Sequence, residues 1–234
     1  MRPLVFDLDL TLIRDQRRDL ALWIGAINAA LGTDLGPDHD WSPYPVHTDH
    51  GLLQALSRTH RGRDFTAEER VGFEALVVSR LDAALVQTPN IFETIAGARA
   101  LLSAVEGRAV IATGNIHPVT VRKLRASGLD HVRLPCSCSA DGLDRAGLVR
   151  RGLERLGWRP GDPATSFGDG TWDLRAARAL GVGFVGIAAD DAHEEHLRGA
   201  GARHVVRDYT DLDSILELAE RAEKLRKLLA GRRR

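Results

Sequence analysis

From about residue 89 to the C-terminus, short apolar segments alternate with longer segments that carry apolar residues at helical spacing. We expect strands at about residues 109–112, 164–167 and 183–187, in short segments that lie between the helical patterns. Strands that alternate with helices are joined by right-handed crossovers, which make the strands parallel and cover both faces of the sheet. A short apolar segment at the start of the chain, Leu4-Val5-Phe6, is typical of one more buried strand.

Helical patterns fill the sections between these strands. We expect helices over about residues 93–106, 118–127, 145–157, 173–180 and 193–198, and a last amphipathic helix from residue 211. Two weaker strand signals lie near residues 132–134 and 204–206. The fold class predicted from this alternation is α/β, with a Rossmann-like, doubly wound parallel sheet.

Residues 15–87 interrupt the alternation because they contain only helical patterns. One of these helices has a capping box at its start, in which Thr66 is followed three residues later by Glu69. The simplest interpretation is an all-helical cap domain (15–87) inserted after the first strand of a core domain (1–14 and 88–234). We expect the hinges of this insertion near Ile13-Arg14 and Thr88-Pro89.

Composition excludes several classes of protein. The 32 basic residues balance the 32 acidic ones, so the chain lacks the positive charge typical of nucleic-acid binding. No apolar stretch is long enough to span a membrane, and the N-terminus does not resemble a signal peptide. Cys136 and Cys138 are expected to be free thiols in a reducing cytosol, which predicts a cytoplasmic protein. The preference for arginine over lysine suggests a GC-rich bacterial genome.

Polar residues follow three of the predicted strands at the edge where open parallel sheets bind ligands. They form the segments Asp7-Leu8-Asp9, Thr113-Gly114-Asn115 and Gly168-Asp169, the last followed by Asp173. Loop residues at the end of any one strand are often polar, but this does not account for four carboxylates at one edge. Clustered carboxylates repel each other unless a cation or proton lies among them, and oxygen ligands suit Mg²⁺. The sequence therefore predicts a metal–phosphate site.

These motifs and their order resemble the haloacid dehalogenase-like hydrolase superfamily, and within it the phosphoglycolate-phosphatase-like members that have a helical cap. The segment from Phe6 to Ile13, FDLDLTLI, fits the DxDxT pattern of the family. Thr113-Gly114-Asn115 fits its second motif, and Gly168-Asp169 with Asp173 fits its fourth. The resemblance covers essentially the whole chain and implies a cap at residues 15–87, which we call the helical block.

The resemblance also implies a role for each matching residue. Asp7 would be the nucleophile, and Asp9 the general acid and then the general base, with its backbone carbonyl facing the metal. Thr113 would donate its hydroxyl to the phosphoryl oxygens, assisted by the Gly114 or Asn115 amide. Asp169 would bind Mg²⁺, and Asp173 would either bind it as well or orient the residues that do. The metal set implied for Mg²⁺ is thus Asp7, Asp9, Asp169 and Asp173.

The chain departs from the family pattern at the basic residue that usually precedes the fourth motif. That residue is most often lysine, but no lysine lies between Lys123 and Lys224. Arg145 begins the appropriate helix and is our candidate, as a catalytic and phosphate-binding group. Lys123 is the second candidate, although its position in the middle of a helix is more typical of a surface residue.

The function implied is Mg²⁺-dependent hydrolysis of a small-molecule phosphomonoester through an aspartyl-phosphate. Asp9 argues against a dehalogenase, because a halide leaves without a proton whereas an alkoxide needs one. Alternatives that remain open are a phosphomutase or dehalogenase on the same fold, and a non-catalytic phosphate-binding or regulatory protein. No nucleic-acid or membrane partner is expected.

Several histidines allow two interpretations. The segment His47-Thr48-Asp49-His50 either helps to recognise the leaving group of a substrate or simply begins a helix, with Thr48 or Asp49 as the N-cap. His193 and His196 are expected to be solvated on a surface helix.

Overall fold

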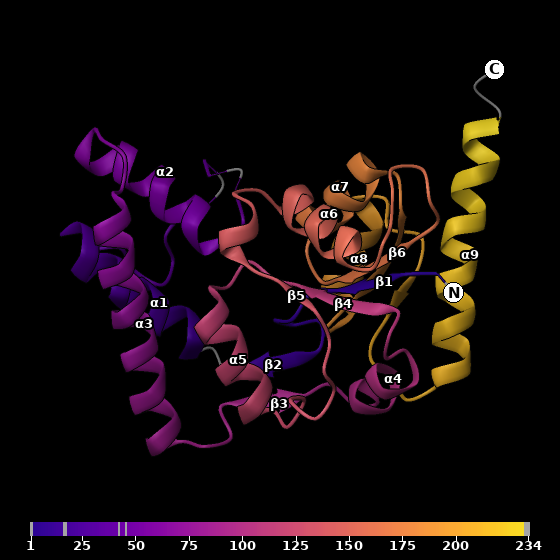
Figure 1. Ribbon diagram of the computed structural model, residues 1–234, viewed down its shortest axis with the longest axis horizontal. Helices are drawn as coiled ribbons and strands as arrows, with labels where there is room; N and C mark the ends of the chain where they lie inside the picture. Colours follow the sequence, from indigo (N-terminus) through magenta and orange to yellow (C-terminus); the bar gives the residue numbers. More distant parts are fainter. Residues whose placement is uncertain (1, 16–17, 42, 45, 232–234) are drawn as a thin grey trace.

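A six-stranded parallel sheet lies at the centre of the computed structural model, which describes residues 2–15, 18–41, 43–44 and 46–231 (Figure 1). The strand order is β5-β4-β1-β6-β7-β8, and every pairing between neighbours is parallel. The strands are β1 (Leu4–Phe6), β4 (Ala109–Ala112), β5 (Cys136–Ser137), β6 (Thr165–Gly168), β7 (Gly183–Ile187) and β8 (Val205–Val206). The predicted doubly wound α/β sheet is confirmed.

Strands β1, β4 and β7 consist of apolar residues and glycine because both faces of the sheet are covered, whereas β6 also contains the buried polar residues Thr165 and Ser166. In β1, Leu4 and Phe6 pack into one core cluster, whereas Val5 between them packs into another. The first cluster includes side chains of α4 (Ala98–Ala104), α5 (His117–Ala126) and α9 (Leu212–Gly231). The second includes side chains of α6 (Arg145–Arg155), α7 (Thr171–Leu180) and α8 (Asp191–Gly199). Side chains of adjacent strand residues point to opposite faces, so a strand that is buried on both sides has no face exposed to solvent.

The helical block consists of α1 (Arg18–Leu31), α2 (Asp49–Arg61) and α3 (Ala67–Gln87), which lie together on the left of Figure 1, to one side of the sheet. The predicted capping box is confirmed at α3, where the Thr66 side chain accepts a hydrogen bond from Glu69 N and the Glu69 side chain accepts one from Thr66 N. The apolar sides of these helices continue the core cluster that underlies the sheet.

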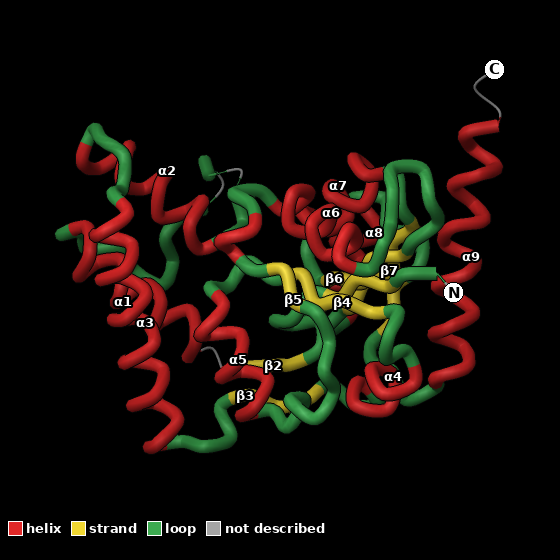
Figure 2. The backbone as a smooth tube through the Cα atoms, viewed as in Figure 1, coloured by secondary structure: helices red, strands yellow, loops and turns green. Residues whose placement is uncertain are grey.

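Two short strands connect the helical block to the sheet, and they correct one sequence prediction. Residues 93 and 94 were expected to belong to a helix over 93–106, but they lie in β3 (Phe92–Thr94), which pairs antiparallel with β2 (Ile13–Asp15). The helix begins only after Gly97, whose φ is 78°. Figure 2 shows β2 and β3 side by side, although β2 lies about eighty residues earlier in the chain, so no local pattern indicated the pairing. The division of the chain at 14/15 and 87/88 stays a prediction.

The strand expected near residues 132–134 is also misplaced. The edge strand is β5, in which Cys136 pairs with Ile111 and Ser137 pairs with Ala112. It lies at the edge of the sheet and pairs only with β4. A single-turn 3₁₀ helix, η1 (Ser139–Asp141), follows it.

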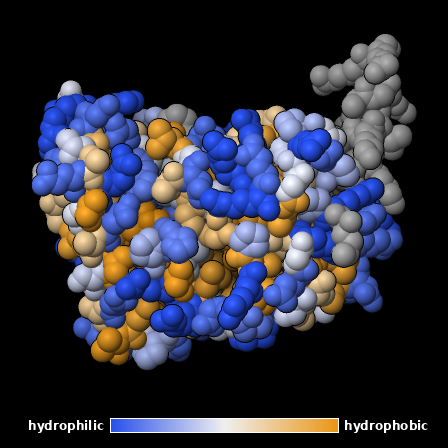
Figure 3. All heavy atoms as spheres, viewed as in Figure 1, coloured by the Kyte–Doolittle hydropathy of each residue, from blue (hydrophilic) through white to orange (hydrophobic). Residues whose placement is uncertain are grey.

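Within the described part of the chain, no helix is both long enough and apolar enough to cross a membrane. The face of the molecule seen in Figure 3 carries polar and apolar residues intermixed. Cys136 and Cys138 are free thiols, as predicted, and their sulfur atoms lie 3.0 Å apart.

Candidate active site

The sheet topology brings the predicted site residues to one edge. Asp7, Thr113 and Asp169 directly follow β1, β4 and β6, which are adjacent strands with β1 in the middle. Because these strands are parallel, their carboxyl ends meet at the same edge of the sheet. The first turn of α7 adds Asp173, and the first turn of α6 adds Arg145.

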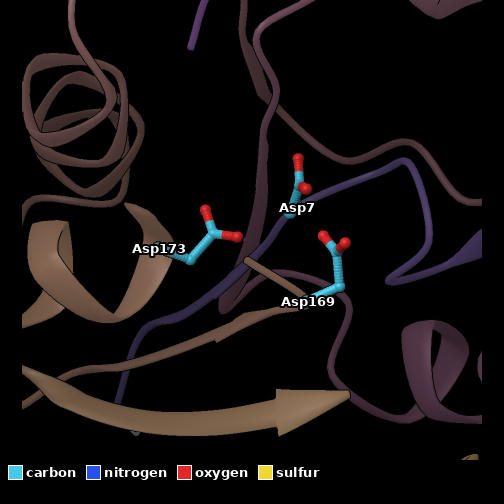
Figure 4. Close-up of side chains that lie close together, drawn as sticks. All are labelled: Asp7, Asp169 and Asp173. Carbon is cyan, nitrogen blue, oxygen red and sulfur yellow. The ribbon is translucent and has the colours of Figure 1, made fainter. Parts of the chain in front are cut away.

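Three buried carboxylates form an acidic cluster. One carboxylate oxygen each of Asp7, Asp169 and Asp173 lies within 4.8 Å of the other two, and Figure 4 shows the three carboxyl groups close together. Asp173 is fixed by its Oδ2 atom, which accepts a hydrogen bond from Gly170 N (3.0 Å). A β-carbon at position 168 would lie 2.5 Å from the Asp173 side chain, so glycine at this position is required for the approach.

The electrostatics of this cluster fit a hard cation. Burial raises the pKa of Asp7 to about 7, and repulsion by Asp173 and Asp9 adds to the shift, which Arg145 opposes. The pKa of Asp169 is likewise raised well above its ordinary value, first by burial and then by the charges of Asp7 and Asp173. Carboxylates in this situation either bind protons or share a cation. All the ligand atoms of the acidic cluster are oxygens, the donor type that suits Mg²⁺.

Arg145 lies on the acidic cluster, at the start of α6. Asp144 caps this helix by accepting a hydrogen bond from Gly147 N (2.7 Å). The Nη2 atom of Arg145 lies 2.5 Å from Asp7 Oδ1, and its Nε atom lies 2.5 Å from Asp173 Oδ1. The guanidinium group is therefore placed to offset part of the negative charge and to meet a phosphoryl group bound at Asp7.

The loop after β4 presents the second motif. Thr113 Oγ1 accepts hydrogen bonds from the backbone N (3.3 Å) and the side-chain Nδ2 (2.8 Å) of Asn115. Both bonds use lone pairs of the hydroxyl, so its O–H points elsewhere and can donate to an anion.

The side chain of Asp9 lies outside the acidic cluster. Its Oδ1 atom accepts a hydrogen bond from Lys123 Nζ (2.8 Å), and its Oδ2 atom accepts one from Asn115 Nδ2 (2.5 Å). The expectation that Lys123 is a surface residue is wrong, because its side chain has 0% exposure and contacts Asp9. The two basic candidates thus occupy different places: Arg145 lies against Asp7, and Lys123 against Asp9.

The start of α2 lies against the loops of the sheet edge. Asp49 N donates to Gly114 O (2.8 Å), and Asp49 Oδ2 accepts a hydrogen bond from Ile116 N (2.9 Å). His50 N donates to Ser139 Oγ (2.7 Å). A β-carbon at Gly114 would lie 2.5 Å from the carbonyl oxygen of His47, so only glycine permits this approach. The helical block is therefore seated directly over the second motif.

The segment at residues 47–50 begins a helix, as one of its two interpretations predicted, and it also lies beside the site, as the other interpretation, recognition of the leaving group, requires. Thr48 is the N-cap of α2, because its side chain accepts a hydrogen bond from Gly51 N. His47, one residue earlier, stacks on Trp172 of α7, with ring centroids 4.5 Å apart and the planes at 21°. Burial lowers the pKa of His47, and the charge of Arg175 lowers it further. A neutral ring is thus placed where the helical block meets the fourth motif.

His193 contacts the loop that holds Asp169, whereas the sequence pattern predicted that it would be solvated. Its Nε2 atom lies 2.9 Å from the carbonyl oxygen of Asp169, while Ala189 N donates to its Nδ1 atom (3.2 Å). Since Nδ1 accepts, Nε2 carries the proton and donates to the loop that holds Asp169. Its position on a polar helix gave no signal of this contact, which depends on how α8 packs against β7 and β8.

Comparisons with known proteins support the fold. No protein-family model matches the chain, and no curated protein matches it. Among solved structures, a hydrolase from Pseudomonas syringae is 22% identical, with a TM-score of 0.68 over 93% of this chain and 98% of that one. CbbY from Rhodobacter sphaeroides, solved in complex with phosphate, is 18% identical, with a TM-score of 0.66 over 91% and 96% of the two chains.

A haloacid dehalogenase-like family hydrolase from Streptococcus pneumoniae is also similar. It is 13% identical, with a TM-score of 0.61 over 92% of this chain and 98% of that one. The similarity extends over nearly the whole length of each chain, so it includes the helical block as well as the sheet. The chain therefore has the fold of the haloacid dehalogenase-like hydrolases, in agreement with the resemblance of its motifs.

Proposed function

We propose that the protein is a Mg²⁺-dependent phosphatase that hydrolyses a small-molecule phosphomonoester through an aspartyl-phosphate on Asp7. One observation carries this proposal: the structure separates the two aspartates of the first motif. Asp7 lies in the acidic cluster beside Arg145, whereas Asp9 is held apart by Lys123 and Asn115. A nucleophile and an acid–base group of the same residue type need different surroundings of this kind.

In the first half-reaction, a carboxylate oxygen of Asp7 attacks the phosphorus atom and the bond from phosphorus to the ester oxygen breaks. Asp9 gives its proton to that oxygen, which leaves as an alcohol. Thr113, the backbone amide of Gly114 and Arg145 donate hydrogen bonds to the phosphoryl oxygens. Mg²⁺ held by Asp7, Asp169 and Asp173 would offset the negative charge of the phosphoryl group.

In the second half-reaction, Asp9 acts as the base. It takes a proton from water, the water oxygen attacks phosphorus, and the bond between phosphorus and Asp7 breaks. Inorganic phosphate leaves and Asp7 returns to a carboxylate, so no atom or charge is left over. An aspartate at position 9 supports ester hydrolysis rather than dehalogenation, because a halide needs no proton.

The helical block supports a substrate of small size. We propose that residues 15–87 form a cap that covers the site during turnover and excludes other water. The complex of CbbY with phosphate, a protein of the same fold, is consistent with a phosphorylated substrate. A cytoplasmic location in a bacterial cell remains part of this proposal.

The test is hydrolysis of p-nitrophenyl phosphate by the purified protein with MgCl₂, with a chelator, and in the Asp7→Asn variant. We expect turnover only in the wild-type protein with Mg²⁺. Asp213→Asn, a change at an exposed residue early in α9, serves as the matched control and should keep full activity. Activity that persists in the chelator or in Asp7→Asn would refute the proposal.

A phosphomutase would give a different result in the same system. The phosphoryl group of the intermediate would pass to a second hydroxyl group of a sugar phosphate rather than to water. Incubation with labelled sugar phosphates followed by product analysis distinguishes the two, since a phosphatase releases inorganic phosphate. Trapping of beryllium fluoride on Asp7 reports the intermediate site even where the aryl phosphate is a poor substrate.

A further inference from the structure

The ammonium group of Lys123 is buried where the helical block meets the sheet. The side chain has 0% exposure, and its Nζ atom lies 5.5 Å from the centroid of the Phe92 ring in β3. A buried charge of this kind is costly unless it is paired and hydrogen bonded. Lysine is rarely buried to this extent without a partner, so its contacts indicate what it does.

Each of the three protons of the ammonium group has an acceptor. Lys123 Nζ lies 2.8 Å from Asp9 Oδ1, 2.5 Å from Asp19 Oδ2 and 3.0 Å from Asn115 Oδ1. The acceptors come from three separate places: the loop after β1, helix α1 of the helical block, and the loop after β4. Burial by itself would lower the pKa of Lys123, but the charges of Asp19 and Asp9 outweigh it and raise the pKa.

The same contacts orient Asp9. Because its two oxygens accept from Lys123 and Asn115, the plane of the carboxyl group is held from both sides. Asn115 is held in turn, since its Oδ1 accepts from Lys123 while its Nδ2 donates to both Asp9 and Thr113. Each oxygen of Asp9 keeps a second lone-pair direction that can face a substrate or water.

The geometry points to Lys123 as a positioning residue that orients Asp9 for proton transfer, and to Asp19 as the group through which the helical block completes that orientation. Only when α1 lies against the sheet edge does the ammonium group have all three of its acceptors. Proton transfer by Asp9 therefore depends on contact between the helical block and the carboxyl edge of the sheet. This inference rests on the proposed function of Asp9 as acid and base.

The helical block can be held against the core without the buried contacts of Lys123 with Asp9 and Asp19. Arg122, the neighbour of Lys123 on α5, pairs with Asp82 of α3 through two contacts of 2.5 and 2.9 Å. That pair joins the same two parts of the molecule near the surface, without contacting a site residue. It therefore provides a matched control, because its loss removes a cation of α5 from the junction and leaves Asp9 untouched.

The test compares two substrates that differ in their need for a proton. An alkyl phosphate needs protonation of its leaving oxygen, whereas p-nitrophenolate leaves readily as an anion. A group that orients the general acid therefore affects the first substrate far more than the second. We expect Lys123→Met to lower kcat/KM by about 100-fold on the alkyl phosphate, with a small change on p-nitrophenyl phosphate. Asp9→Asn sets the benchmark for this pattern.

Asp19→Asn tests the link to the helical block, and it keeps the test informative if Lys123→Met does not fold. The Asp19 side chain is 25% exposed and asparagine has the same shape, so the variant is compatible with the fold. We expect a selective loss on the alkyl phosphate that is smaller than that of Lys123→Met. Arg122→Met is expected to leave the ratio of the two kcat/KM values at the wild-type value.

Equal losses on both substrates in Lys123→Met, or in Asp19→Asn where the first variant does not fold, would overturn the positioning role. A wild-type ratio in Asp19→Asn would overturn the coupling to the helical block. Failure of the proposed function looks different, because wild-type hydrolysis would then be absent or would persist in Asp7→Asn. The wild-type and Asp7→Asn controls therefore identify which of the two inferences has failed.

Discussion

Replacing Asp49 by asparagine removes a partly buried carboxyl group at the start of α2. Burial raises its pKa from the ordinary value of 3.8 to about 7. The nearby charges of Asp19 and Asp9 raise it further, whereas the hydrogen bond from Ile116 N and the charge of Lys123 oppose the shift. The same carboxyl group joins the helical block to the loop after β4.

The sign of the effect follows from proton binding. Between pH 3.8 and about pH 7 the folded state retains a proton on Asp49 that the unfolded state has lost. The free energy of unfolding therefore decreases as the pH rises through this window. Above pH 7 ionisation of Asp49 lowers the free energy of unfolding by about 4 kcal/mol at most. About 2.5 kcal/mol of this decrease develops between pH 5 and pH 8. Asparagine carries no charge and still offers an oxygen to Ile116 N, so it avoids this penalty.

The assay is urea unfolding of the wild-type protein and Asp49→Asn at pH 5 and pH 8 in the same MgCl₂ concentration. We expect the free energy of unfolding of Asp49→Asn, relative to that of the wild-type protein, to be about 2.5 kcal/mol higher at pH 8 than at pH 5. All other titrating groups are common to both proteins, so their effects cancel. Asp34→Asn, at an exposed residue of the helical block, should follow the wild-type profile. Parallel profiles for the wild-type protein and Asp49→Asn would refute the reasoning.

Three further predictions follow from the site. Arg145→Met should lower kcat/KM for aryl phosphate by about 100-fold or more, because a fixed donor to the phosphoryl group is lost; steady-state kinetics checks this, and wild-type kinetics would contradict it. Gly114→Ala should destabilise the protein by about 1–3 kcal/mol, because the new methyl group meets the His47 carbonyl; urea unfolding measures the loss. Mg²⁺ at about 100 times its Kd should stabilise the folded protein by about 2.7 kcal/mol. Mg²⁺ should bind more tightly at pH 8 than at pH 6, because Asp7, with a pKa of about 7, must lose its proton to bind the ion. Thermal unfolding with and without MgCl₂ follows this effect, which Asp169→Asn should abolish.

Local patterns in the sequence were sufficient for the parallel sheet, except for the position of its edge strand β5, and for the residues at the carboxyl ends of its central strands. A parallel strand buried on both faces has a continuous apolar sequence, and its C-terminal end is the first place where polar residues can appear. For that reason the sequence alone assigned Asp7, Thr113 and Asp169 to one edge of the sheet. Helix capping is equally local, and the capping box of Thr66 and Glu69 was predicted for the same reason.

Contacts between distant segments were decided only by the tertiary structure. The pairing of β2 with β3 joins residues on either side of the helical block, so the local pattern at residues 93 and 94 wrongly indicated a helix. Lys123 was expected at the surface because a lysine in the middle of a helix is usually solvated. Its burial is tolerated only because Asp9 and Asp19, more than one hundred residues earlier, supply the opposite charge. The energy of a buried ion depends on groups brought together by the whole fold, and no local pattern in the sequence records it.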